Sequence, residues 1–487
     1  MLDMWTPLVK NIAILSALLL IATLLKSRLK ILQNFYVPNS IIAGFLGLLL
    51  GDQVFRLFSI PSDTLKDYIY HLLGITFIAI SLKKSNNSKC KNAVSTGFAF
   101  AFGYGIQAFL GFGLSLLVLS KIFPKFNPIN GILVQLGFSN SPAIASNIAR
   151  GWEKVLLANS TLGQGFAEKT GIIYSSDIGL TFGAIGFIIA CIAGVIIIKY
   201  GVKKGYTVFL KNESSVKDST KTGYIKNKDK QLEAGRQTTN SEAIDTLSIH
   251  VSLILIIYIM TYYLLKLILF GFGHAPEGVA FLGQVVVNFH FILGAFIAII
   301  VKKIMTLLKI DFIIDNGISE RISGLSVDFM VTASLAAISI AVVIDFMIPI
   351  IIISTIVGVA TFLYCAYFGS RGFKDYKFER IITVFGIATG TMATGMALLR
   401  VVDPDFKSPI ASETMYGSGL VFFFTMPIMI LINLPLKALV TGNGFLDWLS
   451  LILVGSYTIL ILILWRITGL IKFGKPHGKI FQIDKSL

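Results

Sequence analysis

The chain has 487 residues, of which 55% are hydrophobic and 14% are charged, and its mean hydropathy is +0.78. A soluble domain carries about 25% charged residues, so the composition excludes an ordinary soluble protein and indicates an all-α polytopic membrane protein. The net charge of +16 is typical of Lys- and Arg-rich loops that stay in the cytoplasm, and no nucleic acid is expected as a partner. The few cysteines and histidines show no spacing for a disulfide framework or a metal centre, so no cofactor is expected.

Eleven apolar segments predict membrane spans, several of them short or interrupted by Gly and Pro. The first five cover residues 8–25, 37–55, 68–82, 94–119 and 177–200, and the other six cover 247–270, 279–301, 325–344, 347–368, 417–434 and 446–465. Lys and Arg concentrate in the loops after the first, third, seventh, ninth and eleventh spans. This alternation predicts an N-terminus outside and a C-terminus in the cytoplasm.

Residues 202–246 break the apolar pattern. They are rich in Lys, Ser, Thr, Asn and Gly, and such a composition predicts a flexible basic cytoplasmic linker. The linker divides the chain into a first membrane repeat at 1–201 and a second at 247–441. Residues 442–487 then form an extra C-terminal helix and a cytoplasmic tail.

Each half carries one further apolar segment between its fourth and fifth spans. The first is INGILVQLGFSNSPAIASNIAR at 129–150, and the second, at 381–400, includes GIATGTMATGMALLR. Non-helical backbone at membrane depth is tolerated only where it is buried in protein or lines a cavity. Interrupted segments at matching places in two halves are the best pointer to the binding site of a transporter.

Because each half has an odd number of spans, the second half enters the membrane from the opposite side. The pattern therefore predicts two inverted-topology repeats of five transmembrane helices, each with a re-entrant hairpin whose tip lies near the midplane. Close helix packing through small residues is the alternative interpretation of both segments.

The chemistry of a broken helix predicts the site. It offers N–H groups that attract a carboxylate, and C=O groups that suit sodium together with hydroxyl and amide oxygens. The predicted substrate contacts are Ser139, Asn140, Ser141, Thr389, Gly390, Thr391, Thr394, Gly395 and Arg400. The predicted sodium ligands are Asn140, Ser141, Thr391, Asp177 and Glu413. Arg400 offers a fork for a carboxylate but also fits a rim charge paired with Asp403, and the two acidic residues also fit helix caps.

The sequence ATGTMATGMALLRVVDPDF at 388–406 resembles the second hairpin of the sodium/glutamate symporter family. The sequences QLGFSNSPAIASNIARGWEK at 135–154 and GLTFGAIGFIIA at 179–190 resemble its first hairpin region and fifth span. The resemblance covers nearly the whole chain. It implies sodium-coupled glutamate uptake across a bacterial inner membrane by a homodimer, in which a moving transport part carries the hairpins and a scaffold supports it. One departure is the sequence SNSP at 139–142, where the family has a glycine-rich signature.

We therefore expect a secondary active transporter in the bacterial cytoplasmic membrane, which couples sodium to symport of glutamate or a related small carboxylate by alternating access. The alternative within transporters is another organic anion or amino acid, such as a citrate-like hydroxycarboxylate with proton coupling. A channel or a non-transporting receptor on the same fold is a further alternative, although the polar residues form two local clusters and no continuous stripe. An enzyme is not expected, because no nucleophile with a base and no paired acids stand out at the midplane.

Overall fold

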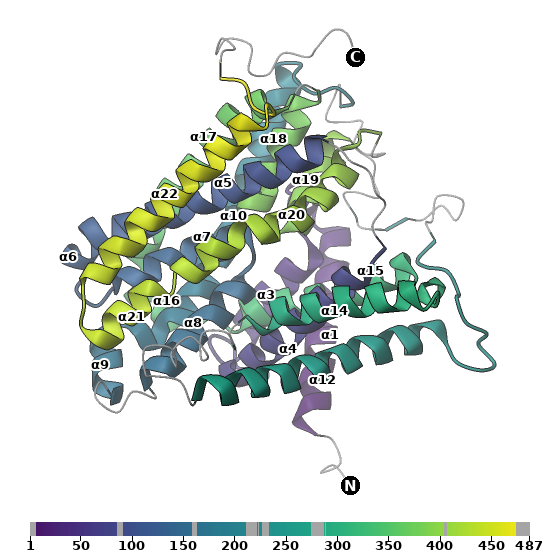
Figure 1. The fold of residues 1–487 in the computed structure, drawn as a ribbon, viewed down its shortest axis with the longest axis horizontal. Helices are drawn as coiled ribbons and strands as arrows, with labels where there is room; N and C mark the ends of the chain where they lie inside the picture. The colour runs from purple at the N-terminus through teal and green to yellow at the C-terminus, as the bar shows by residue number, and fades with distance from the viewer. Residues whose placement is uncertain are drawn as a thin grey trace. The chain divides into compact units, whose positions relative to one another are not determined.

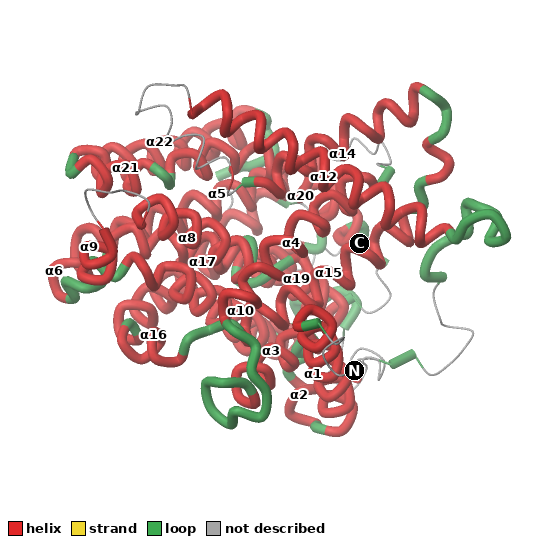
Figure 2. Tube along the Cα trace, turned by 90° about the horizontal axis from the view of Figure 1, so that it is seen from below, coloured by secondary structure: helices red, strands yellow, loops and turns green. Residues whose placement is uncertain are grey.

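The computed structural model describes residues 6–84, 91–157, 163–210, 222, 224–225, 233–273, 287, 289–373, 375–403 and 407–473. All regular structure in this part of the chain is helical, as Figure 2 shows. Within these residues, nine helices are long and apolar enough to cross a membrane. The expected class of all-α polytopic membrane protein is confirmed.

Two of the eleven predicted spans differ from this set of nine helices. The segment predicted at 37–55 contains α3 (Asn39–Leu50) with 12 residues, which reaches only about 18 Å at 1.5 Å per residue, against about 30 Å of hydrocarbon. The segment predicted at 325–344 is divided, because α15 (Asn316–Ala336) ends and α16 (Ile340–Asp345) begins after a short break. The first part of the predicted span 279–301 lies outside the described residues, and α14 (His290–Leu307) follows it.

The chain forms two compact units, each built from both halves of the sequence. Unit 1 contains residues 1–20, 43–87 and 225–337, and unit 2 contains 21–42, 88–224 and 338–487. Each half thus gives its earlier spans to unit 1 and its later spans, with the hairpin segment, to unit 2. Helix α1 (Pro7–Arg28) is divided between the two units.

Unit 1 is centred on α4 (Ser62–Leu82), which packs against α14 and α15, while α12 (Thr246–Gly273) packs against α14. Figure 1 shows α12, α14 and α15 as the teal and green helices of this unit. His290 ties α14 to α4, because its Nε2 lies 2.9 Å from the carbonyl oxygen of Tyr70 and its ring stacks on the Tyr70 ring.

Unit 2 is centred on α5 (Lys91–Leu114), which contacts α20 (Ile410–Leu431), α17 (Met347–Gly372) and α22 (Phe445–Ile467). Figure 1 shows α5, α20 and α22 running side by side. Helix α10 (Ser175–Lys203) packs against both hairpin segments. The remaining elements of the unit are α2 (Lys30–Asn34), η2 (Ser115–Leu119), α6 (Ser120–Ile122), η3 (Pro128–Ile132), α7 (Leu133–Ser139), α8 (Pro142–Leu157), α9 (Gly163–Lys169), η4 (Ile172–Tyr174), α18 (Lys377–Ala388), α19 (Met392–Val402) and α21 (Leu434–Thr441).

The described ends of the predicted linker at 202–246 are packed against neighbouring helices. Leu210 is buried in the core of unit 2. At the other end, in unit 1, the Thr238 hydroxyl donates a 2.7 Å hydrogen bond to the carbonyl oxygen of Ile313. Residues 211–221, 223 and 226–232, in the middle of the predicted linker, lie outside the described part.

Close backbone contact between α5 and η3 requires glycine on both elements, at Gly111 and at Gly131. A Cβ on Gly111 would lie 2.3 Å from the carbonyl oxygen of Gly131, whereas a Cβ on Gly113 would meet only a side-chain atom of Leu451 at 3.5 Å. The two glycines lie two residues apart on one helix, so they form a matched pair for a packing test.

We predict that Gly111→Ala destabilises the protein by about 1–3 kcal/mol, as overpacking does. Gly113→Ala is expected to be neutral or to stabilise α5 by up to about 1 kcal/mol through helix propensity. Thermal unfolding of both variants in detergent measures the difference. Equal midpoints for the two variants would contradict the close contact.

Candidate functional site

Both predicted hairpin segments are broken helices. In the first, α7 ends at Ser139 and α8 begins at Pro142. In the second, α18 ends at Ala388 and α19 begins at Met392. Each break therefore brings the C-terminus of one helix and the N-terminus of the next to the same place, which we call the tip of the hairpin.

Gln107 on α5 connects the two tips. Its Nε2 donates to the carbonyl oxygen of Ala388 at 2.7 Å and to the Thr361 hydroxyl at 2.9 Å. The Ser139 hydroxyl donates to Gln107 Oε1 at 2.5 Å and approaches the same Ala388 oxygen at 3.3 Å. Residues 249 positions apart in sequence are thus brought into direct contact.

Helix α10 lies against both tips through glycines. A Cβ on Gly183 would lie 2.5 Å from a side-chain atom of Pro142 in the first tip. A Cβ on Gly186 would lie 2.5 Å from the carbonyl oxygen of Thr389 in the second tip and 3.0 Å from Phe138. No side chain fits there, so the backbone of α10 itself forms one wall of the tip region.

In the second tip, hydroxyl groups hold the break in place. Thr391 and Thr394 form a capping box, in which each side chain accepts a hydrogen bond from the backbone N–H of the other. The Thr394 hydroxyl also donates to the carbonyl oxygen of Gly386 at 2.7 Å, and the Thr389 hydroxyl donates to that of Phe385 at 2.8 Å. These predicted site residues meet at one place, and their hydroxyls stabilise its backbone.

The two glycines of the second hairpin that were predicted as substrate contacts serve packing between its arms. A Cβ on Gly395 would lie 2.2 Å from a side-chain atom of Ile387, and one on Gly390 would lie 2.4 Å from the Thr394 hydroxyl oxygen. The small-residue interpretation of this segment therefore holds for both glycines.

The first tip is held in a similar way. Ser141 is buried, and its hydroxyl accepts the N–H of Ile144 at 3.2 Å, which caps α8. Asn140 Nδ2 donates to the Tyr104 hydroxyl at 2.9 Å.

Gln135, one helical turn before Ser139, is fully buried beside the same Tyr104 hydroxyl. Neither polar atom of its amide makes a hydrogen bond of normal geometry within the described residues.

Arg400 is not brought to the tips. It lies nine residues after Thr391, so the rise along α19 puts it about 13 Å away, and its side chain is exposed. This position of Arg400 fits the alternative interpretation given above, in which it is a charge near the end of the hairpin. The carboxylate of Asp403 accepts instead from Ser408, through its N–H at 2.9 Å and its hydroxyl at 2.6 Å.

The two acidic residues predicted as sodium ligands also lie away from the tips. Glu413 is buried with Arg380, which donates to its Oε2 at 2.5 Å, and Asn92 Nδ2 donates to its Oε1 at 3.2 Å. Asp177 lies in the first turn of α10, where its Oδ1 accepts the N–H of Ser339 at 3.3 Å. This contact satisfies a backbone N–H that the break between α15 and α16 leaves without a helical partner.

The tips therefore contain hydroxyl, amide and carbonyl oxygens, with no carboxylate among the predicted residues placed there. Across the described part of the chain, no three His, Cys, Asp or Glu side chains come together. Neutral oxygens of this kind are acceptable ligands for a hard monovalent cation and poor ligands for zinc.

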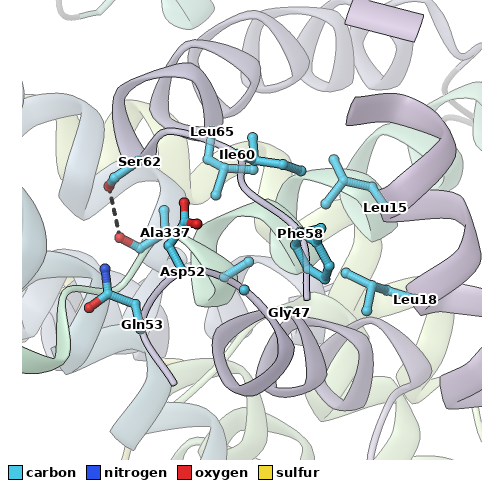
Figure 3. Close-up of a pocket in the computed structure, with 12 residues that line it drawn as sticks. Leu15, Leu18, Gly47, Asp52, Gln53, Phe58, Ile60, Ser62, Leu65 and Ala337 are labelled. Carbon is cyan, nitrogen blue, oxygen red and sulfur yellow. Dashed lines mark hydrogen bonds between the residues drawn. The ribbon is translucent and has the colours of Figure 1, made fainter. Parts of the chain in front are cut away.

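A pocket in unit 1 contains none of the predicted site residues. Figure 3 shows Leu15, Leu18, Phe58, Ile60 and Leu65 around it, with Asp52 among them. The Ser62 hydroxyl at its edge donates to the carbonyl oxygen of Ala337 at 2.9 Å. Its lining combines these apolar side chains with the polar Asp52, Gln53 and Ser62. The polar groups at the hairpin tips come from both halves of the sequence and make the better candidate site.

Sequence reasoning missed Gln107, Tyr104 and Thr361. Gln107 and Tyr104 lie three residues apart and therefore share one face of α5, next to two glycines. A polar residue inside a predicted span is a signal in itself, and Gln107 could have been selected on that ground. Its contacts with Thr361, Ser139 and Ala388 could not be predicted, because these residues come from three other elements.

We predict that Gln107→Met, which keeps the volume but removes the amide, destabilises the protein. It leaves the Ala388 carbonyl and the Ser139 hydroxyl without this partner, at a cost on the order of 2–3 kcal/mol. Ser120→Ala is the control, because that hydroxyl donates only a long 3.3 Å bond to its own helix, and a change below about 0.5 kcal/mol is expected. Thermal unfolding in detergent compares the two, and a Gln107→Met protein as stable as the control would exclude the bridge.

Comparison of the chain with family models, curated proteins and solved structures gave no significant match. A functional assignment therefore depends on the residues of this chain and on their geometry. On those grounds the chain is a multi-pass membrane protein in which two broken helices, one from each half of the sequence, meet tip to tip.

Proposed function

We propose that the protein is a secondary active transporter that couples sodium to symport of glutamate or a related small carboxylate. The observation that carries the proposal is the pair of broken helices whose tips meet at Gln107. Such pairs, one from each half of a polytopic chain, form the substrate and ion sites of inverted-repeat transporters. The resemblance of 135–154 and 388–406 to sodium/glutamate symporters points to the same class.

The carboxylates of the substrate bind at the helix N-termini of the two tips. Helices α8 and α19 both begin there, and each directs the positive end of its dipole toward the tip. Two such ends suit a substrate with more than one carboxylate, and glutamate also offers an ammonium for the carbonyl oxygens at the ends of α7 and α18. Arg400 lies too far from the tips to act as the clamp in this arrangement.

Sodium binds to the neutral oxygens beside the substrate. Asn140, Ser141 and Thr391 remain the predicted ligands from the tips, together with backbone carbonyl oxygens. Asp177 and Glu413 have other partners at some distance and are left out of this proposal. A bound cation offsets the negative charge of the substrate, which would otherwise make its transfer through the membrane costly.

Alternating access then requires one part of the protein to carry the tips between the two faces of a bacterial cytoplasmic membrane. Both hairpins belong to unit 2, so unit 2 is the moving part and unit 1 the scaffold, in a protein that works as a homodimer. Two inverted repeats, with the N-terminus outside, provide the two-fold relation between the outward and inward states.

A different organic anion with proton coupling is the second candidate. It is favoured by one observation, the sequence SNSP at 139–142 in place of a glycine-rich tip. Ser139 and Asn140 bring side chains into the first tip, and the amide of Gln135, one helical turn before Ser139, makes no hydrogen bond of normal geometry among the described residues. These extra groups suit a substrate with a hydroxyl, such as a citrate-like hydroxycarboxylate.

We expect purified protein in liposomes to accumulate labelled glutamate when sodium is higher outside, and to lose accumulation when the gradient is removed. Thr391→Val removes the cap of α19, at a cost of about 1–2 kcal/mol, and is expected to lower the uptake efficiency about tenfold. Thr441→Val is the control, because its hydroxyl donates within its own exposed turn to Lys437.

Accumulation of glutamate that does not depend on the sodium gradient would contradict sodium coupling. A proton gradient and labelled citrate in the same liposomes then test the second candidate. If neither substrate accumulates under either gradient, the assignment as a carboxylate symporter fails.

Single cysteines at the two tips test the inverted arrangement. In a protein without its native cysteines, Asn140→Cys is expected to react with an impermeant maleimide from the outside, and Thr391→Cys from the cytoplasm. Substrate with sodium is expected to slow both reactions, because it fills the space between the tips. Labelling of both positions from the same side alone would contradict the inverted repeats.

A further inference from the structure

The first part of the predicted linker folds back onto the base of the second hairpin. After α10 ends at Lys203, residues 206–210 form what we call the docked segment. Its Phe209 ring stacks on the Tyr376 ring with 5.5 Å between the centroids, and the centroids of the Tyr206 and Phe378 rings lie 6.3 Å apart. The Thr207 hydroxyl donates to the carbonyl oxygen of Leu210, whose side chain is 2% exposed. The segment therefore has its own packing against α18.

A buried carboxyl group lies under this segment. Glu379 is in the first turn of α18 and is fully buried. Its Oε1 accepts the backbone N–H of Val208 at 2.6 Å, so the carboxyl is bonded directly to the docked segment. Its Oε2 has no hydrogen-bond partner among the described residues. An ionised carboxylate needs more than one such partner when it is removed from water.

The neighbouring charges do not neutralise Glu379. The guanidinium of Arg380, the next residue, donates to Asp375 at 3.0 Å and to Glu413. Asp403, at the end of α19, adds a second negative charge that acts on Glu379. In the docked segment, Tyr206 is the titratable side chain, and Lys203 and Lys204 before it are exposed to solvent.

This environment favours the protonated form of the Glu379 carboxyl group. Burial raises the pKa of Glu379 to about 7, and Asp403 acts in the same direction. The N–H of Val208, the backbone N–H of Glu379 and the charge of Arg380 oppose the rise in this pKa without cancelling it. Glu379 precedes the re-entrant part of the hairpin and lies outside the spanning helices.

We propose that Glu379 is a proton-operated latch, whose neutral form keeps residues 206–210 docked on the base of the second hairpin and whose ionised form releases them. When the proton leaves, the charge requires water, and water reaches it only if the segment above it moves away. The proton goes to solvent, and the bond from Val208 to Oε1 is replaced by bonds to water.

The direction of the pH dependence follows from proton linkage. The docked state has a raised pKa, so it binds more protons than the released state. Its extra stability is complete below about 4.5, the ordinary pKa of the group, and is lost as the pH rises through about 7. Between pH 6 and pH 8 the docking constant is expected to fall about tenfold.

The latch has a consequence for transport that rests on the proposed function. The docked segment leads through residues 211–224 to residue 225, where the chain enters unit 1. If unit 2 moves relative to unit 1 during transport, release of the segment removes one of the contacts that hold this connection to unit 2. The latch would then make transport sensitive to cytoplasmic pH near neutrality.

The latch is tested by thiol labelling of the full chain in detergent, with its native cysteines replaced by alanine. Leu210→Cys reports release of the segment, and Lys204→Cys, already exposed, corrects for the reactivity of thiols at each pH. We expect the ratio of maleimide labelling rates, Leu210→Cys over Lys204→Cys, to rise about tenfold between pH 6 and pH 8. Thr207→Cys serves as a second buried reporter where the first variant does not fold.

Glu379→Gln is the matched control. Gln keeps an acceptor for the Val208 N–H but does not titrate, so the ratio is expected to stay constant over the same pH range. An equal rise in the Gln variant, or a constant ratio with Glu379 present, overturns the latch. The labelling needs neither glutamate nor a gradient, so its failure is distinguishable from failure of the transport assignment.

Discussion

Two breaks in helical backbone leave peptide groups without partners in their own helices, and the organisation of unit 2 follows from how the protein satisfies them. At membrane depth each unsatisfied N–H or C=O costs several kcal/mol. Side chains next to the breaks avoid this cost by hydrogen bonding to the peptide groups. They are the Thr391–Thr394 capping box, the Ser141 cap, and the Gln107 amide, which donates to the Ala388 carbonyl oxygen. Because one glutamine serves both hairpins, the two breaks hold each other in position.

This arrangement depends on close backbone approach around the tips. Gly183 and Gly186 of α10 leave room for Pro142 and for the Thr389 carbonyl, and Gly111 of α5 leaves room for the first arm of hairpin one. Small residues at helix contacts therefore serve the site directly, since they set how near the tips come to one another. The small residues that the sequence analysis assigned to helix packing therefore also determine the shape of the proposed site.

The sequence was sufficient to predict the membrane class, most spans and both broken segments, because apolar length and interrupted apolar pattern are local signals. It was insufficient for the roles of the hydroxyl and charged groups. Thr391 was predicted only as a ligand, and the position of Thr394 in space shows that it also caps α19. Arg400 belongs to the same helix as the second tip, but helical rise separates it from the tip in space. Glu413 lies on α20, where it pairs with Arg380. Gln107 was missed because its partners lie 32, 254 and 281 residues away along the chain.

The division of each half between the two units has a consequence for biosynthesis. Neither unit contains a continuous half of the chain, so neither can be completed while only the first half has left the ribosome. Until α17 and α18 are inserted, Gln107 lacks its Thr361 and Ala388 partners. During that time the polar face of α5 has no protein partners there and must be hydrated. Contacts of such long sequence separation form late and slowly. The nascent first half is thus the stage at which this protein is most exposed to misassembly and to quality-control proteases.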